Sequence, residues 1–315
     1  MSGAAARPKV EWRDVDGILL LAKPAGITSN HALQRVRRLY RAAKAGHTGS
    51  LDPFATGLLP VCFGQATKLA GLLLESDKRY RARLALGSRT ATGDLEGAII
   101  ESQAVPPLTP ATVRAVLARF VGPIEQVPPM YSALKRGGEP LYALARRGVE
   151  VERPARRVEI LALSLETLEA HALEFVVHCS KGTYVRTLGE DLARALGTVG
   201  HLAALERLDV GAFENQRSYT LVELESNPPS DAELDARLLP LESALAGYPR
   251  VALNADGASR FRHGARVAIA GHPLPERDRA GAVCVFDVDG RLLGLGEPGD
   301  DGASVAPRRL LCAAA

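Results

Sequence analysis

The sequence predicts an α+β protein with a mixed, largely antiparallel sheet core, flanking helices and a small β-rich module at the carboxyl end. Residues 158–168 and 173–179 have strand-like composition and are joined by a short polar link, as in an antiparallel pair. Apolar residues at helical spacing recur between the strand-like segments. Beyond about residue 248 the pattern changes to short apolar runs punctuated by glycine.

The first expected element is a strand over residues 16–23, which ends at Pro24. Thr28 and Ser29 are suitable caps for a following helix. The apolar residues of that helix recur at helical spacing and are Leu33, Val36, Leu39 and Tyr40. Residues 43–57 contain three glycines and a proline without any periodicity, so we expect a loop there.

Further elements follow from the same patterns. Residues 65–75 are expected to be helical, and residues 79–86 alternate basic and apolar side chains like a half-exposed strand. A helix is predicted over residues 109–120, with a threonine cap followed by proline in the first turn. Another is predicted from Val185 to Leu196, where Gly197 ends it.

The carboxyl-terminal part is expected to form a separate module. A last helix over residues 238–246 precedes a boundary near residue 248, which divides the chain into residues 10–247 and 248–315. Four short strands are expected in the module, over residues 251–253, 265–270, 282–287 and 291–295. Asp289-Gly290 lies between two apolar runs and favours a tight hairpin.

Composition excludes several classes of protein. The chain has 315 residues, of which 46% are hydrophobic and 24% charged, as in ordinary globular proteins. Its longest apolar stretches fall far short of the roughly 18 residues of a membrane-spanning helix. The amino terminus reaches Arg7 without an apolar region, so we expect a cytoplasmic protein that does not contact a membrane. The four cysteines form no C-x-x-C pair and are expected to be buried free thiols.

Basic residues are concentrated in two segments. Residues 23–89 carry twelve Lys or Arg against three acidic residues, a local charge of +9. Residues 131–157 carry seven against three, a local charge of +4. Such clusters favour a surface that binds a polyanion, although a solvated helix face explains residues 31–41 equally well.

Asp52 is the only acidic residue between Asp16 and Glu75, in a segment rich in positive charge. A lone carboxylate in such surroundings is held ionised and is suited to nucleophilic chemistry. The alternative is a loop aspartate that forms an Asx turn before Pro53, and the spacing alone leaves both interpretations open.

Five runs resemble the TruB family of tRNA pseudouridine synthases, in the order and spacing of that family. They are residues 23–29 (KPAGITS), 46–57 (GHTGSLDPFATG), 77–80 (DKRY), 126–133 (QVPPMYSA) and 179–186 (CSKGTYVR). The carboxyl-terminal segment, with His263-Gly264 and residues 306–309 (APRR), resembles the PUA-like RNA-binding module that often follows.

This resemblance implies the pseudouridine synthase fold and an isomerase active in tRNA processing. Its reaction converts the T-loop uridine to pseudouridine-55 by base flipping, without a cofactor and without a metal. The implied partner is the T arm of tRNA, and family precedent suggests a monomer. Extraction of the base is required because its reacting atoms are unreachable inside the stacked loop.

The resemblance also implies roles for single residues. Asp52 matches the family nucleophile, Tyr80 the tyrosine that stacks on the flipped base, and Arg186 the arginine that pairs with the catalytic carboxylate. An arginine can hold a carboxylate by two parallel hydrogen bonds, which a lysine cannot reproduce.

Four further residues are expected to contact the substrate, and they are His47, Tyr184, Lys23 and Leu202. For Lys23, a structural role beneath the catalytic loop is equally consistent with the motif. Glu206 departs from the family pattern, which commonly has a basic residue at this position.

Other functions are consistent with parts of the sequence. A protein that binds tRNA and assists its folding would need the same basic surface, but not the set of Asp52, Tyr80 and Arg186. A glycoside hydrolase needs a second carboxylate, which the motif runs lack. Phosphate-binding glycine motifs of nucleotide-dependent enzymes are absent from the sequence.

Overall fold

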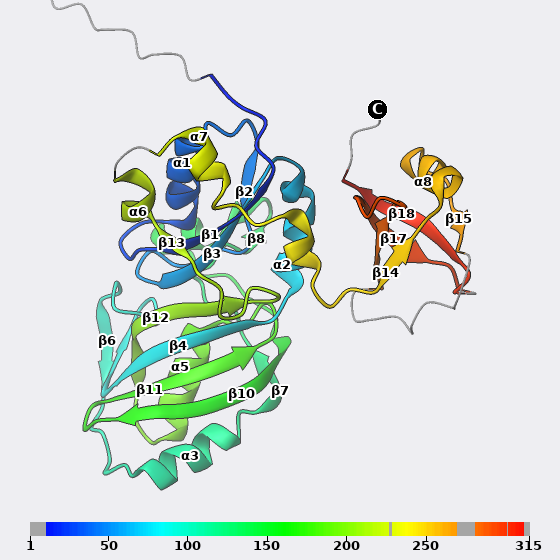
Figure 1. Cartoon of the computed structure of the whole chain (residues 1–315). Coiled ribbons are helices and arrows are strands. Elements are labelled where there is room, and N and C mark those ends of the chain that lie inside the picture. Colours follow the sequence, from blue (N-terminus) through cyan, green and yellow to red (C-terminus); the bar gives the residue numbers. More distant parts are fainter. Residues whose placement is uncertain (1–10, 227–228, 270–280, 301, 312–315) are drawn as a thin grey trace, which may run out of the picture.

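The computed structural model describes residues 11–226, 229–269, 281–300 and 302–311, which fold around a nine-stranded and a five-stranded sheet (Figure 1). The large sheet has the order β13-β1-β3-β12-β4-β11-β10-β7, and β2 pairs with β3. Its strands are β1 (Gly17–Lys23), β2 (Ala45–His47), β3 (Thr56–Phe63), β4 (Lys78–Leu86), β7 (Gly122–Gln126), β10 (Arg156–Leu168), β11 (Ala172–Cys179), β12 (Gly200–Val210) and β13 (Tyr219–Thr220).

Helices and two small hairpins surround this sheet. The helices are α1 (Ser29–Leu39), the 3-10 helix η1 (Gly64–Leu69), α2 (Ala70–Glu75), α3 (Pro110–Ala118), α4 (Leu141–Arg146), α5 (Val185–Ala195), α6 (Leu221–Glu225), α7 (Asp231–Asp235) and the 3-10 helix η2 (Leu241–Leu245). The hairpins are β5 (Ser88–Thr90) with β6 (Ile99–Ser102), and β8 (Lys135–Arg136) with β9 (Glu139–Pro140). The expected α+β class is therefore confirmed.

Strand β12 joins the two halves of the large sheet. It runs antiparallel to β4 along nearly its whole length, whereas it pairs with β3 in parallel at only two positions, Glu206 with Thr56 and Arg207 with Gly57. The predicted antiparallel pair of β10 and β11 is confirmed. The two halves of the sheet therefore meet over a short contact beside Asp52.

Helices α3 and α5 cover one face of β4, β10, β11 and β12 (Figure 1). Leu188 and Leu192 of α5 are fully buried against this face, and each contributes about 1.5–3 kcal/mol of hydrophobic stabilisation. The predicted cap of α3 is confirmed, since the Thr109 side chain accepts a hydrogen bond from the backbone of Thr112. Sequence periodicity predicted both helices because each has one apolar face.

Strand β1 is buried on both faces. Leu19 and Leu21 pack against α1 and α6, whereas Ile18 and Leu20 belong to a second apolar cluster on the opposite face. This double burial explains the nearly continuous apolar run of the strand.

Some elements differ from the sequence-based expectation. The segment expected to be a loop contains β2, and the helix expected over residues 65–75 is split into η1 and α2. Strand β3 was not predicted because Pro60 lies in its middle, and prolines are uncommon inside sheets. Strand β12 was not predicted because two bulges interrupt its alternation. Only η2 forms within the helix expected over residues 238–246.

The second sheet has the order β14-β16-β17-β18-β15 and packs beside α8 (Ala255–Arg262). Its strands are β14 (Arg250–Ala252), β15 (Val267–Ala268), β16 (Val283–Phe286), β17 (Leu292–Pro298) and β18 (Ser304–Leu310). The expected hairpin at Asp289-Gly290 is confirmed, since β16 and β17 are antiparallel neighbours. Strand β18 was not predicted. Residues 270–280 and 312–315 of the expected module lie outside the described residues, and the boundary near residue 248 stays a prediction.

The two sheets share an apolar cluster. Cys284, Phe286 and Leu295 of the smaller sheet belong to the same cluster as Ile18 and Leu20 of β1. Three of the four cysteines are buried free thiols, as expected, and they are Cys62, Cys179 and Cys284. Cys312 lies outside the described residues.

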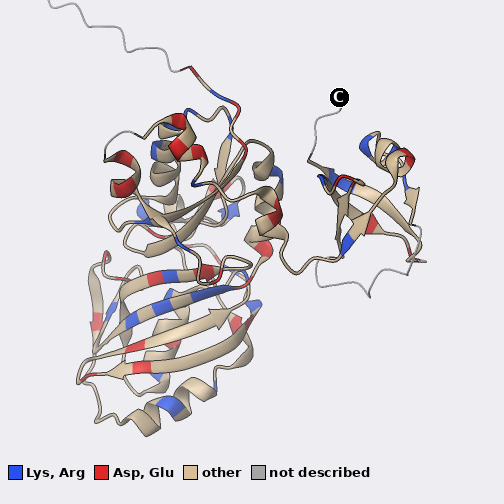
Figure 2. Ribbon diagram, in the orientation of Figure 1, with Lys and Arg blue, Asp and Glu red and all other residues tan. Residues whose placement is uncertain are grey.

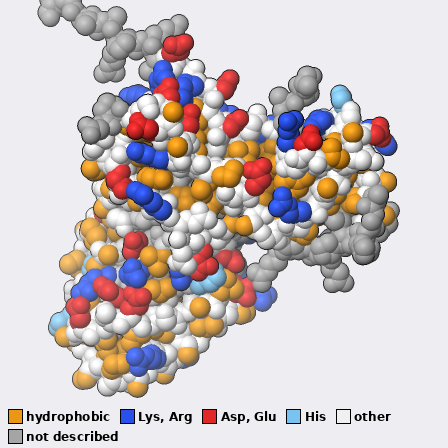
Figure 3. All heavy atoms as spheres, in the orientation of Figure 1, with side chains coloured by type: hydrophobic (Ala, Val, Ile, Leu, Met, Phe, Trp, Pro, Cys, Tyr) orange, Lys and Arg blue, Asp and Glu red, His pale blue; other side chains and the backbone are white. Residues whose placement is uncertain are grey.

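Six of the twelve cations of the first basic segment form ion pairs in the described structure, most of them with distant parts of the chain. On β4, Arg81 pairs with Glu166 and Glu206, and Arg83 pairs with Glu169 and Glu174. Arg35 and Arg41 near α1 pair with Glu225 and Asp231 in the same way. Figure 2 shows basic and acidic residues side by side on these strands, and Figure 3 shows the two kinds of charge interspersed on this face. These ion pairs reduce the positive charge that the paired arginines present to a polyanion, and polyanion binding by the remaining cations of residues 23–89 stays a prediction.

Gly57 is required where β3 meets β12. Its φ is +98°, and a Cβ atom there would lie 2.7 Å from the backbone nitrogen of Arg207 and closer still to its carbonyl oxygen. We expect Gly57→Ala to lower the free energy of unfolding by about 3 kcal/mol. An alanine with this positive φ is strained, and its Cβ atom would also overlap the backbone of Arg207. Urea denaturation monitored by circular dichroism measures this change.

Gly46→Ala is the matched control, because Gly46 lacks a positive φ and a Cβ there meets no described atom within 4 Å. Equal urea midpoints of unfolding for the two variants would contradict the requirement for glycine at position 57.

Candidate active site

The loop that carries Asp52 is held from below by the segment between β1 and α1. Lys23 Nζ donates to the carbonyl oxygens of Pro24, Ile27 and Pro53, the last at 3.2 Å. Ser29 Oγ accepts a hydrogen bond from the Leu51 amide at 2.7 Å. These bonds fix the backbone on both sides of Asp52, so the loop is preorganised although most of it lacks regular structure.

Arg186 binds the Asp52 carboxylate with two prongs. Its Nε lies 2.9 Å from Oδ2 and its Nη2 lies 3.3 Å from Oδ1. The side chain of Arg186 is only 5% exposed, whereas that of Asp52 is 37% exposed. The arginine is therefore a fixed anchor, while the carboxylate remains accessible from the cavity.

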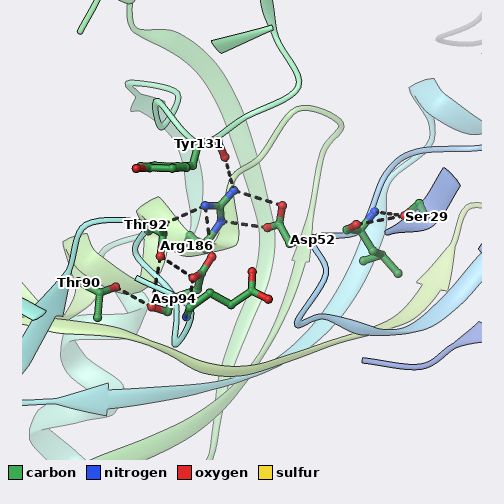
Figure 4. A network of polar contacts seen from close by, with 9 residues as sticks. Ser29, Asp52, Thr90, Thr92, Asp94, Tyr131 and Arg186 are labelled. Atoms are coloured by element: carbon green, nitrogen blue, oxygen red, sulfur yellow. Dashed lines mark hydrogen bonds and ion pairs between the residues drawn. The ribbon is translucent and has the colours of Figure 1, made fainter. Parts of the chain in front are cut away.

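The remaining donors of Arg186 bind three other groups (Figure 4). Nη1 donates to the Thr92 carbonyl at 2.8 Å, and Nη2 donates to the Tyr131 carbonyl at 2.7 Å. Asp94, which is also buried, lies 3.4 Å from Nη1 and accepts a hydrogen bond from the Thr92 hydroxyl at 2.5 Å. One guanidinium thus links the Asp52 loop, the turn after β5 and the segment after β7.

Burial and the neighbouring cations act in opposite directions on the pKa of Asp52. Burial raises the pKa of its carboxyl group above the ordinary value, and the charge of Asp94 raises it further. Arg186 and Lys23 oppose this increase. The two cations thus favour the ionised form that a nucleophile requires.

A cavity of about 360 Å³ opens above Asp52. Its lining combines aromatic, aliphatic and charged side chains, including Asp52, Tyr80, Tyr184, Arg186, Leu205 and Arg207. Aromatic walls beside a fixed carboxylate suit a flat ring whose attached atom reacts with that carboxylate. Within the described parts of the chain, no group of three His, Cys, Asp or Glu side chains is placed to hold a metal ion.

Comparison with known proteins assigns the family. The TruB family pseudouridylate synthase N-terminal domain matches residues 37–185, and the tRNA pseudouridylate synthase B C-terminal domain matches residues 186–246. The chain is 48% identical over 302 residues to tRNA pseudouridine synthase B of Hydrogenovibrio crunogenus, and the match covers 96% of each chain. The chain belongs to the TruB family. A further family domain, pseudouridine synthase II TruB C-terminal, matches residues 249–311.

Other comparisons agree with this family. The chain is 49% identical over 312 residues to tRNA pseudouridine synthase B of Burkholderia mallei, covering 99% of each chain. Among solved structures, it resembles a chain of a Cbf5-Nop10-Gar1 complex with a TM-score of 0.73 and 23% identity, covering 94% of this chain and 85% of that one. The structural likeness supports the pseudouridine synthase fold.

Four of the residues singled out from the TruB motifs line one cavity, although they are far apart in the sequence. They are Asp52, Tyr80, Tyr184 and Arg186. Tyr80 comes from β4, and Tyr184 precedes α5, where Gln126 binds both its backbone amide and its carbonyl. Burial raises the pKa of both tyrosines, so both phenols are neutral near pH 7.

Two further motif residues of this TruB chain lie near the cavity without lining it. Lys23 is 1% exposed and its ammonium group binds three carbonyls, which agrees with the structural role considered above. Burial lowers its pKa to about 8. His47 lies on β2, and burial lowers the pKa of its imidazole, to which the charge of Arg207 adds.

Leu202, like Lys23, is an expected substrate contact whose side chain the structure buries away from the cavity. Its side chain is fully buried in the core, where a Cβ on Gly189 would meet it at 2.9 Å. Leu202 opposes Leu84 and Leu205 opposes Ala82, so the bulge between Leu202 and Ala204 leaves both leucines on the same face of β12. Leu205 is the one nearer to Tyr80 along the sheet, and it lines the cavity. The sequence contains no signal for this bulge.

Sequence reasoning also missed Asp94 and Arg207. Asp94 lies in a turn outside the motif runs, and its partner Arg186 follows 92 residues later, so no local pattern joins them. Glu206, which departs from the family pattern, pairs with Arg81 at 3.2 Å.

The described part of the chain contains no helix long and apolar enough to span a membrane.

The link between Asp94 and Arg186 predicts an altered pH dependence in Asp94→Asn. Removal of the Asp94 charge lowers the pKa of Asp52, so the acidic limb of the rate profile should move to lower pH. The plateau rate should fall by about 10-fold, because Arg186 loses one of the groups that orient it. Single-turnover rates of pseudouridine formation between pH 5 and 9 measure both changes.

Asp191→Asn removes a carboxylate that pairs with Arg194 on α5 and serves as the control. An unchanged limb and plateau in Asp94→Asn would show that Asp94 does not act on Asp52.

Proposed function

We propose that the chain isomerises the T-loop uridine of tRNA to pseudouridine, with Asp52 as the nucleophile. The coarser activity, conversion of uridine to pseudouridine in tRNA, follows from relatives about 48–50% identical over nearly the whole chain. The observation that carries the proposed nucleophile is the two-pronged bond from buried Arg186 to the accessible Asp52 carboxylate at the cavity.

The proposed reaction conserves every atom of the nucleotide. The bond between N1 and C1′ breaks with its electron pair on the uracil ring, and the ring turns so that C5 forms a new bond to C1′. The proton on C5 is lost and N1 gains one, so substrate and product are isomers. Asp52 acts as a transient nucleophile and leaves as a carboxylate, while Arg186 keeps it ionised and oriented.

Tyr80 and Tyr184 are proposed to hold the flipped base. Both line the cavity, and an aromatic face stacks on a base without requiring a particular hydrogen-bond pattern. Filling the cavity with the base also excludes water from the reacting bond. Lys23 is proposed to act from beneath the loop and His47 from beside it, where its ring can meet RNA near the flipped nucleotide.

The second basic segment supports binding of the T arm. Among the residues that the structure describes, its cations outside any ion pair are Lys135, Arg136, Arg146, Arg156 and Arg157. Lys135, Arg136 and Arg156 line one further pocket, and unneutralised cations of this kind favour binding of RNA phosphates. We assign residues 10–247 to a catalytic domain and residues 248–315 to a PUA-like RNA-binding domain. We further propose that the protein acts as a cytoplasmic monomer.

Asp52→Asn tests the nucleophile. We expect wild-type protein to form pseudouridine at the T-loop uridine of unmodified tRNA transcripts and the variant to form none. The reason is that a neutral amide is a much weaker nucleophile than a carboxylate. Chemical mapping of every uridine gives the position, and filter binding gives the tRNA affinity, which the isosteric variant should retain. An isolated T-arm hairpin should also be a substrate.

Asp191→Asn again serves as the control for loss of a carboxylate. Turnover by Asp52→Asn would refute the nucleophile, and modification only outside the T loop would refute the site. Tight binding without modification by wild type would indicate a protein that binds tRNA without reacting.

A further inference from the structure

Three buried cations surround the Asp52 loop and bind carbonyl oxygens instead of carboxylates. Lys23, Lys78 and Arg207 are each less than 9% exposed. Lys78 Nζ donates to the carbonyls of Leu73 and Leu74 in the last turn of α2 and of Ser76 just after it. Lys23 binds three carbonyls in the same way below Asp52. Within the described ranges, none of the three forms an ion pair. The positive charge of these three side chains is therefore satisfied by carbonyl oxygens, without a carboxylate in direct contact.

Arg207 is the cation of this group that spans the cavity floor, the part of the lining where β12 meets β3 and the loop of Asp52. It is 2% exposed, and its Nε donates to the Leu58 carbonyl at 2.7 Å. Its Nη2 donates to the Gly49 carbonyl at 3.1 Å, three residues before Asp52. One guanidinium thus connects β12 to β3 and to the catalytic loop.

Arg207 also lies directly opposite Tyr80 on the neighbouring strand. Side chains of directly opposed residues project from the same face of a sheet, and both residues line the cavity. Burial raises the pKa of the Tyr80 phenol, and the charge of Arg207 opposes that increase. The guanidinium therefore contacts two parts of the site at once, the loop of Asp52 and the aromatic wall.

The environment of Arg207 contrasts with that of Arg186. Arg186 lies within 4 Å of two carboxylates, Asp52 and Asp94, so its charge is more than balanced. No carboxylate among the described residues lies within that distance of Arg207. A buried guanidinium without a counterion is costly, and its field extends into a cavity of low dielectric constant with little screening. Such a charge is retained most usefully where a negative charge forms.

We propose that Arg207 is a positioning residue of the isomerisation, which fixes the cavity floor and stabilises the negative charge that the uracil ring carries while it is detached from C1′. This inference rests on the proposed function. When the bond between N1 and C1′ breaks, its electron pair stays on the ring and the charge spreads over the ring nitrogens and carbonyl oxygens. The charge disappears when C5 bonds to C1′, C5 loses its proton and N1 gains one. Attack of Asp52 on the ring would also place negative charge there, so the role holds for either route.

Two substitutions separate charge from hydrogen bonding. Arg207→Gln keeps a hydrogen-bond donor for the carbonyls but removes the charge, whereas Arg207→Lys keeps the charge and loses the forked geometry. We expect the Gln variant to react about 100-fold more slowly in single turnover at saturating enzyme, with a tRNA Kd within about 3-fold of wild type. The Lys variant should stay within about 10-fold of the wild-type rate, since Lys23 and Lys78 show that an ammonium group is accommodated by carbonyls here.

Arg81→Gln is the matched control, because Arg81 lies on β4 beside Tyr80 but points to the opposite, exposed face. Its rate and Kd should equal those of wild type. Equal rates for the Gln and Lys variants would overturn the proposed role of charge, as would a loss confined to Kd. If the Gln variant does not fold, a folded Lys variant slower than wild type by more than about 100-fold overturns it. Wild-type protein that leaves tRNA unmodified would refute the proposed function, whereas an active wild type with an equally active Gln variant refutes only the role of Arg207.

Discussion

The candidate site depends on the buried guanidinium of Arg186. It holds Asp52, Asp94 and two backbone carbonyls, so three segments distant in sequence meet at one side chain. Burial of an arginine side chain costs free energy because the charge loses its hydration, and carboxylate partners and hydrogen bonds from its donors offset that cost. Its position follows from α5, whose leucines pack on the sheet and thereby bring the first turn of the helix beneath the loop of Asp52.

Much of the fold could be predicted from periodicity, and part of the site from motif residues. Helices α3 and α5 each have one apolar face, and most of β4 alternates basic and apolar residues, so local pattern sufficed. Strands β3 and β12 could not be found because a proline and two bulges hide them. Leu202 and Leu205 lie on the same face of β12, and Leu205 reaches the cavity because it pairs closer to Tyr80 on β4, a partner strand far away in sequence.

Charge showed the largest difference between sequence and structure. A stretch with a local charge of +9 suggests an RNA-binding face, yet its arginines on β4 pair with acidic residues that follow 85 or more residues later. The cations that matter for the site are few and buried. Counting charges along the chain therefore overestimates the surface that attracts RNA phosphates. It also overlooks Arg207, whose proposed role depends on the lack of a carboxylate partner.

The apolar cluster shared by the two sheets has a consequence for truncation. Ile18 and Leu20 of β1 are covered partly by Phe286 and Leu295 of the smaller sheet. A chain cut before residue 248 would expose this side of a strand that also borders the segment supporting Asp52. Shortened forms of the protein would therefore aggregate or lose catalytic order, and a low RNA affinity measured on them would report damage to the larger sheet instead of the absence of an RNA contact.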